Sequence, residues 1–170
     1  MNLIEIFLKE LAQEAVTTRK MLSIIPEDKY DWRPHPKSMT VRQLATHLAE
    51  LPSWVQIALT TTELDFAANP YSNPVIDQNE AMLAYFETNQ NSAIAALEKA
   101  TEADLLPNWT MRAGTDIYMV NQKHEVIRIS LCQTTHHRAQ LGVFLRLLDV
   151  PIPGSYGPSA DELEMAAQKA

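Results

Sequence analysis

The chain has 170 residues, of which 46 % are hydrophobic and 21 % charged, and its 14 Lys and Arg against 21 Asp and Glu give a formal net charge of −7. This length suits one domain spanning residues 1–170, and the composition is that of a folded globular protein rather than a disordered chain. No stretch gathers the basic residues that a phosphate backbone needs, so nucleic acid is excluded as an expected partner.

The sequence gives no sign of a membrane or of an oxidising compartment. No apolar run approaches the roughly 18 residues that span a bilayer, and residues 1–5 lack the basic start of a signal peptide. We therefore expect a cytoplasmic protein without a membrane partner. The single cysteine, Cys132, can form neither an internal disulfide nor a thiolate cluster, so any metal must rest on nitrogen and oxygen ligands.

The first half of the chain predicts two helices. Apolar residues recur at spacings of three and four over residues 3–25, and Pro26 ends this pattern. Residues 26–37 form a proline-containing loop whose Trp32 is expected to pack on the bundle. Thr40 and Gln43 have the spacing of a capping box, which predicts the start of a second helix.

Pro52 interrupts the second predicted helix, because a proline removes one backbone N–H donor. We expect a kink near residues 48–51 and a bent continuation to about Leu64. A polar loop over residues 65–75 follows. Asp77 and Glu80 then predict the N-terminus of a third helix. Its expected inner face consists of Leu83, Phe86, Ala93, Leu97 and Ala100.

The last third combines a hairpin signal with two more helices. Residues 105–120 alternate irregularly around Gly114, which predicts a short hairpin or an ordered loop. Asn121 is a candidate cap for a fourth helix that ends where Val150 meets Pro151. Ser159 and Glu162 predict a short C-terminal helix. The expected fold is therefore all-α, a four-helix bundle with a hairpin or ordered loop before the fourth helix.

Two histidines are predicted to point into the bundle from different helices. At 100° per residue, His137 lies about 40° from the apolar centre of the fourth helix, Gln133 about 80° and His136 about 140°. On the second helix His47 lies about 60° from the centre and Glu50 about 120°. His47 and His137 are thus inward, Glu50 is peripheral and His136 faces away.

This pattern leaves two interpretations open. Bundles build metal sites from imidazoles on facing helices, and the i, i+4 spacing lets Gln133 and His137 reach one ion. An inward histidine is also often a core residue whose ring bonds a carbonyl or a hydroxyl, and Thr46 and Thr134 are near at hand.

Several motifs resemble the DinB-like, or YfiT-like, family of bacterial four-helix-bundle proteins. They are PHPKS at residues 34–38, LATHLAELP at 44–52, HHRAQL at 136–141, LLDVP at 147–151 and YGP at 156–158. The resemblance covers about residues 34–162, and the His-His-Arg-x-Gln-Leu element is its most specific part. It implies a bundle that holds a divalent metal with three histidines, often as a homodimer. Relatives include thiol transferases and hydrolases.

Carried onto this chain, the resemblance makes His47 and His137 metal ligands. The third family histidine is replaced by Gln133, whose neutral amide is a weaker donor to zinc, nickel or manganese. Metal binding is therefore expected to be weak or absent. His136 is not expected to substitute, because it points the wrong way.

With three protein ligands, such a site keeps a position open for water or a small-molecule thiol, which the metal would activate for hydrolysis or thiol transfer. Glu50 and Gln140 could orient an imidazole or a water beside the metal, or could simply lie on a solvated helix face. The competing hypothesis is a metal-free relative that binds a small molecule or a protein partner.

Overall fold

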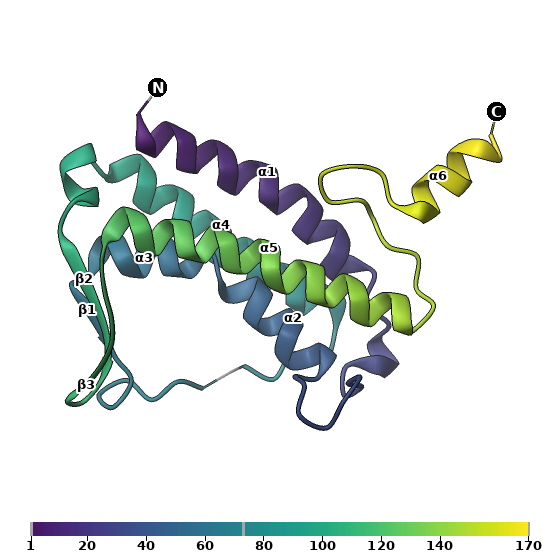
Figure 1. Cartoon of the computed structure of the whole chain (residues 1–170), viewed down its shortest axis with the longest axis horizontal. Helices are drawn as coiled ribbons and strands as arrows, with labels where there is room; N and C mark the ends of the chain where they lie inside the picture. Colours follow the sequence, from purple (N-terminus) through teal and green to yellow (C-terminus); the bar gives the residue numbers. More distant parts are fainter. Residues whose placement is uncertain (1, 73, 170) are drawn as a thin grey trace.

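The computed structural model describes residues 2–72 and 74–169 (Figure 1). Most of these residues are helical, but three short strands form a sheet at one end of the bundle, so the all-α expectation is corrected. The elements in order are α1 Leu3–Ser23, η1 Glu27–Lys29, α2 Val41–Glu50, α3 Ser53–Thr60, β1 Glu63–Asp65, α4 Asn79–Lys99, η2 Glu102–Leu105, β2 Asn108–Ala113, β3 Asp116–Gln122, α5 Lys123–Leu147 and α6 Ala160–Ala167.

The bundle consists of α1, the pair α2–α3, α4 and α5, packed side by side (Figure 1). Helices α1 and α2–α3 each pack against both α4 and α5. The core comprises two clusters of buried side chains, one around Leu48 and Phe86 and one around Ile127 and Trp109. Trp54 packs against both clusters, so the break between α2 and α3 lies where they meet.

The predicted break at Pro52 is confirmed, because α2 ends at Glu50 and α3 begins at Ser53. The carbonyl of Leu51 accepts the Trp54 N–H at 3.1 Å and the Ser130 hydroxyl of α5 at 2.7 Å. A side chain of a neighbouring helix thus bonds the backbone where the proline interrupts the regular ladder.

The sequence predicts a helix that continues to about Leu64, but α3 ends at Thr60. Residues Glu63–Asp65 instead form β1, which pairs in parallel with β2 and gives the strand order β1-β2-β3. The predicted hairpin is confirmed as β2 and β3, and Gly114 turns it with a φ of 58°. A three-residue strand is too short for alternation to reveal it in the sequence.

Two predicted helix caps are confirmed and two are wrong. The capping boxes Thr40–Gln43 and Ser159–Glu162 are both present. Helix α4 begins at Asn79 rather than at Asp77, and its first N–H donates to the carboxylate of Glu27 at 3.0 Å. Helix α5 is capped by Gln122, the last residue of β3, together with Glu125, one position after the predicted cap Asn121. The start of α4 is thus stabilised by a residue far away in sequence, and the cap of α5 lies one residue after the predicted one.

The inner face of α4 is confirmed in its centre and shifted at its ends. Phe86, Ala93 and Leu97 are buried, whereas Leu83 and Ala100 are only partly covered. Met82 and Gln90 are buried in addition, and the Gln90 amide donates to the Leu11 carbonyl of α1 at 3.1 Å. Hydrogen bonding to a backbone carbonyl makes this buried polar side chain tolerable.

The loop between α1 and α2 contacts the core through Trp32. This residue packs on the core as predicted, with its ring edge-on to Phe144 at 5.8 Å between centroids.

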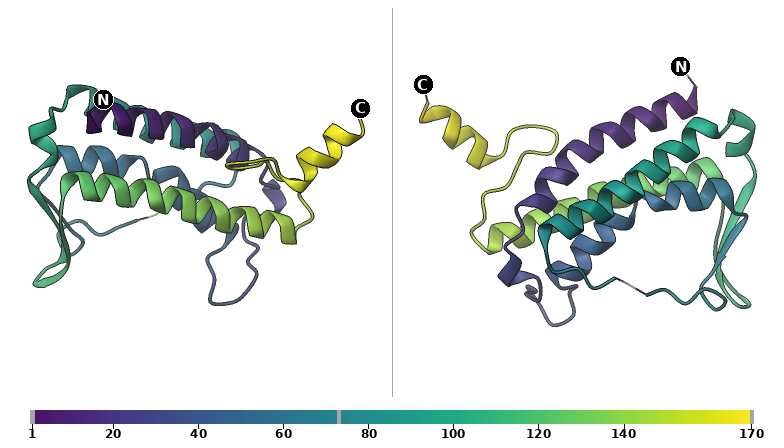
Figure 2. Two further views of the ribbon diagram at one scale, coloured as in Figure 1. Left: turned by 45° about the horizontal axis from the view of Figure 1, so that its top comes forward. Right: turned by 180° about the vertical axis from the view of Figure 1, so that it is seen from behind.

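Helix α5 ends at Leu147, three residues before Val150, because Asp149 turns the chain with a φ of 57°. The Val150 N–H then bonds the Leu145 carbonyl at 3.0 Å. This turn starts the long segment that leads to α6, which projects from the bundle (Figure 2).

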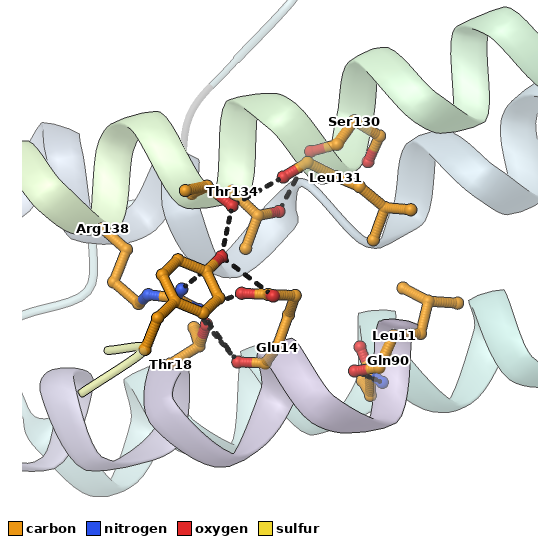
Figure 3. A network of polar contacts seen from close by, with 10 residues as sticks. Leu11, Glu14, Thr18, Gln90, Ser130, Leu131, Thr134 and Arg138 are labelled. Atoms are coloured by element: carbon orange, nitrogen blue, oxygen red, sulfur yellow. Dashed lines mark hydrogen bonds and ion pairs between the residues drawn. The ribbon is translucent and has the colours of Figure 1, made fainter. Parts of the chain in front are cut away.

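A buried ion pair joins α1 to α5. Arg138, whose side chain is 1 % exposed, lies 2.6 Å from the Glu14 carboxylate and also donates to the Thr18 hydroxyl (Figure 3). Tyr156 of the C-terminal segment accepts from Arg138 and donates to Glu14, so the network also anchors this segment. Within residues 2–72 and 74–169, every helix is too short or too polar to span a bilayer.

Candidate metal centre

Two imidazole rings meet at the seam between α2 and α5. The ring centroids of His47 and His137 lie 4.6 Å apart, with 77° between the ring planes. Both side chains are partly covered, and the two helices that carry them pack directly on each other. Each helix thus contributes one histidine to a shared point, which the helical positions of the two residues predicted.

An oxygen acceptor on the same helix holds each ring by Nδ1. The Nδ1 of His47 lies 2.6 Å from Oε1 of Glu50, and that of His137 lies 2.9 Å from Oε1 of Gln140. Both partners are three residues further along, about one helical turn. In the neutral ring an acceptor at Nδ1 places the proton there and leaves the lone pair on Nε2.

The neighbouring hydroxyls of Thr46 and Thr134 are not the hydrogen-bond partners of these two rings. Thr134 donates its hydroxyl to the Ser130 carbonyl at 3.0 Å. The buried Thr46 hydroxyl has no hydrogen-bond partner within residues 2–72 and 74–169. Neither histidine therefore has the ordinary core environment of a ring bonded to a neighbouring threonine.

Glu50 is buried rather than peripheral, which corrects the expectation from its helical position. Its side chain is only 6 % exposed, and its second carboxylate oxygen accepts the hydroxyl of Tyr71. Tyr71 lies between β1 and α4, so a residue outside both histidine-bearing helices holds this carboxylate. Burial, the hydrogen bond to Glu50 and the charge of that carboxylate raise the pKa of Tyr71 above its ordinary 10. The sequence contains no local signal for this contact.

The electrostatic environment favours the neutral form of His137. Burial lowers the pKa of His137 from 6.5, the Gln140 hydrogen bond opposes this shift, and the charges of His47 and His136 lower the pKa further. Because only neutral imidazole binds a metal, the shift leaves this ring ready to act as a ligand near pH 7.

Gln133 and His136 line the same pocket as the two inward histidines. The pocket has a volume of about 460 Å³. Gln133 lies between the other two on the α5 surface, about 60° from His136 and about 40° from His137. The expectation that His136 faces away is therefore wrong: its ring centroid is 4.8 Å from that of His137. The pocket lies on the flank of α5 and not at the apolar centre of that helix, which is at Leu141 and to which the predicted angles refer.

The donor set fits an open, weak divalent site rather than a closed structural one. His47 and His137 offer two imidazole nitrogens, and the Gln133 amide and the His136 ring line the same pocket. Within the described part of the chain, no group of three or more His, Cys, Asp or Glu side chains is placed to hold a metal ion. Solvent or substrate would have to supply the remaining positions.

Comparisons with known proteins agree with this architecture. Residues 1–170 match the profile of the DinB family. The uncharacterized protein YrdA of Bacillus subtilis strain 168 is 23 % identical over 160 residues, which are 92 % of this chain and 89 % of that protein. The crystal structure of the DinB-like protein YjoA from Bacillus subtilis superimposes with a TM-score of 0.68 at 17 % identity, over 88 % of this chain and 96 % of that one.

Two further structures carry functional descriptions of their own. YfiT from Bacillus subtilis, described as a probable metal-dependent hydrolase with an unusual four-helix-bundle topology, has a TM-score of 0.64 at 16 % identity, over 86 % of this chain and 87 % of that one. The mycothiol-dependent maleylpyruvate isomerase has a TM-score of 0.59 at 12 % identity, over 84 % of this chain and 61 % of that one. At these identities the likeness establishes the fold alone.

Proposed function

The chain belongs to the DinB family, and from this membership we propose that it is a divalent-metal-dependent enzyme, a hydrolase or a thiol S-transferase, acting on a small molecule. The support from relatives is that YfiT is described as a probable metal-dependent hydrolase and that another structure of this fold is a mycothiol-dependent isomerase. The support from this chain is the arrangement of its own histidines.

His47 and His137 are the proposed strong ligands through Nε2, and Gln133 is the proposed weak third ligand. A bound divalent ion would lower the pKa of a water or thiol and so supply a nucleophile at neutral pH. With two or three protein donors, positions stay open for that nucleophile and for the substrate.

Glu50 and Gln140 are proposed as positioning residues. Their oxygens accept the Nδ1 protons of His47 and His137, which fixes the orientation of each ring and makes Nε2 more basic. Tyr71 donates to the second oxygen of Glu50 and so holds that carboxylate in place. Three side chains outside the ligand set thus preorganise the two imidazoles.

One observation carries the proposal: two rings 4.6 Å apart, each held at Nδ1 by a separate oxygen acceptor. The test is uptake of zinc, nickel and manganese by untagged, chelator-treated protein, measured by elemental analysis and titration calorimetry. We expect about one ion per chain, lost in His47→Ala and in His137→Ala. His35→Ala is the matched control, because His35 lies exposed in the loop before α2. Uptake well below one ion per chain would refute the proposal.

The reaction itself is tested with metal-loaded protein. Neutral esters and amides probe hydrolysis, and several low-molecular-weight thiols with an electrophile probe S-transfer. Turnover that disappears with the chelator and returns with the metal supports an enzyme. Stoichiometric metal without turnover of either substrate panel would contradict the catalytic part and leave a metal-binding protein.

A second candidate is a metal-free relative that binds a small molecule or a protein partner. The observation that favours it is the replacement of the third imidazole by the Gln133 amide. It predicts that ligands enter the pocket beside His47 and His137 with equal affinity in chelated and metal-supplemented protein. The metal-uptake experiment separates the two candidates.

We also propose that the chain forms a homodimer. The apolar stretch of α5 at residues 129–132 does not provide its surface. Leu131 is buried in its own core, and Ile129 lines the pocket of its own chain. Val143 and Leu147, one turn apart on α5, are instead 58 % and 59 % exposed and offer an apolar patch for a second copy.

A further inference from the structure

The pocket beside the two histidines extends along the bundle toward the sheet. Its α5 lining runs from Val126 to His137, a separation that corresponds to about 16 Å of helix axis. The histidines lie at one end of this lining, and residues of β2 and β3 contribute at the other. The volume of about 460 Å³ falls in the range of small-molecule sites.

The part of the pocket away from the histidines is apolar. Its lining there consists of Leu51, Trp54, Met111, Met119, Val126 and Ile129. Met111 and Met119 are direct partners across the β2–β3 hairpin, so two flexible thioether side chains face the pocket together. Methionine adapts to irregular apolar shapes and contacts aromatic groups well.

The polar side chains of the pocket gather at its histidine end, apart from the Ser130 hydroxyl and the indole N–H of Trp54. Ser130 lies between the two regions, but its hydroxyl proton is already donated to the Leu51 carbonyl at 2.7 Å. None of the described residues that line the pocket is Lys, Arg, Asp or Glu. An ionised group deep in this space would lose its hydration without gaining a partner of opposite charge.

We propose that the substrate of this site is a neutral molecule with an apolar or aromatic body, which fills the space between Trp54 and the Met111–Met119 pair. Its reacting polar group then lies at His47 and His137. The inference deepens the proposed function and rests on it for the position of the reacting group. It disfavours a molecule whose anionic groups would lie in the apolar part, away from the proposed ion, because no cationic side chain lines that part.

The test uses two dyes with the same ring skeleton and different charge. Phenylnaphthylamine is neutral, and anilinonaphthalene sulfonate adds one negative charge. Both brighten on entering an apolar site, so affinities are read from fluorescence titrations of the full chain, with chelator and with zinc. We expect the neutral dye to bind at least about tenfold more tightly than the sulfonate, a difference of about 1.4 kcal/mol.

Met119→Lys tests whether the dyes bind in this pocket. It places an ammonium group in the apolar region. The affinity for the neutral dye should fall at least about tenfold, and the affinity for the sulfonate should rise. Val120→Lys is the matched control, because Val120 is the next residue of β3, is 51 % exposed and faces the other side of the strand. Met119→Gln is neutral and of similar length, and it should lower the affinity for the neutral dye less than Met119→Lys does. This variant keeps the test available if the lysine variant does not fold.

The outcomes separate this inference from the proposed function. Equal or tighter binding of the sulfonate by the unmodified chain, or no effect of the Met119 variants, would overturn the substrate class even if metal binds. A neutral-dye preference that depends on Met119, in protein that takes up no metal, would support the apolar pocket and refute the metal-dependent function. Metal uptake is therefore measured on the same samples.

Discussion

His47 and Glu50 form a 2.6 Å contact between Nδ1 and a carboxylate oxygen, on a helix turn where Glu50 is almost fully buried. A buried carboxylate is costly unless its oxygens are hydrogen-bonded, and here both oxygens have a partner, one the imidazole and the other the Tyr71 hydroxyl. The pair ties the orientation of a candidate ligand to a loop that the sequence places far from it.

Replacing Glu50 should weaken metal binding without removing a ligand. In Glu50→Gln the charged acceptor at His47 Nδ1 becomes a neutral amide, and we expect a loss of about 10–100-fold in zinc affinity. Competition with a chromophoric chelator measures it. The exposed Glu98→Gln on α4 is the control and should leave the affinity unchanged. Equal affinities in the two variants would show that Glu50 does not act through His47.

Restoring an imidazole at position 133 should tighten the site. Gln133→His exchanges a neutral amide for a stronger donor on the same pocket wall, and we expect a gain of about tenfold or more, or about 1.4 kcal/mol. Chelator competition again gives the constants. Cys132→His adds a histidine one residue away, where the side chain lines a different cleft beside α1, and should not tighten binding. An unchanged affinity in Gln133→His would show that position 133 does not reach the ion.

The buried pair of Arg138 and Glu14 should matter for stability. Arg138→Met leaves the Glu14 carboxylate without its guanidinium, and we expect a loss of about 3–5 kcal/mol in the free energy of unfolding, measured with urea. The double variant Arg138→Met with Glu14→Leu should recover most of this loss. Arg146→Met, which breaks a more exposed ion pair with Asp161, should cost about 0–1 kcal/mol. Similar losses in the two single arginine variants would contradict the role of burial.

The contact that anchors α6 should persist in mild acid. Two hydrogen bonds lower the pKa of Asp161 from 3.8 to about 2. The larger effect comes from Arg146 and the smaller from the Ile152 N–H. A lowered carboxylate pKa gives a contact that is complete above pH 3.8 and is lost as the pH falls toward 2. The amide chemical shift of Ile152 should titrate with a midpoint near 2. Asp161→Asn should remove this titration, and a midpoint near 3.8 in the unmodified chain would contradict the contact.

The proposed dimer is tested by light scattering at micromolar concentration. The unmodified chain should scatter as a particle of twice the mass of one chain, and Val143→Glu should convert it to monomer by charging the exposed apolar patch on α5. The control is Val75→Glu, at a loop position that is 83 % exposed, and this variant should remain a dimer. A monomer in the unmodified chain would refute the dimer.

The sequence by itself determined the features that depend on neighbours three or four residues apart. The capping boxes at Thr40 and Ser159 form within one turn, and the break at Pro52 follows from a missing N–H. The inward positions of His47 and His137 follow from the 3.6-residue period. Such features need no knowledge of the rest of the chain, because helical hydrogen bonds join residues four apart.

Only the tertiary structure decided which distant groups complete the site. The Tyr71 hydroxyl on Glu50, the pairing of β1 with β2 and the approach of Met111 and Met119 to the pocket join segments far apart in sequence. No local spacing encodes these contacts. His136 was misplaced for the same reason, since its angle on α5 acquires a meaning only once the position of α2 fixes which flank of α5 borders the pocket.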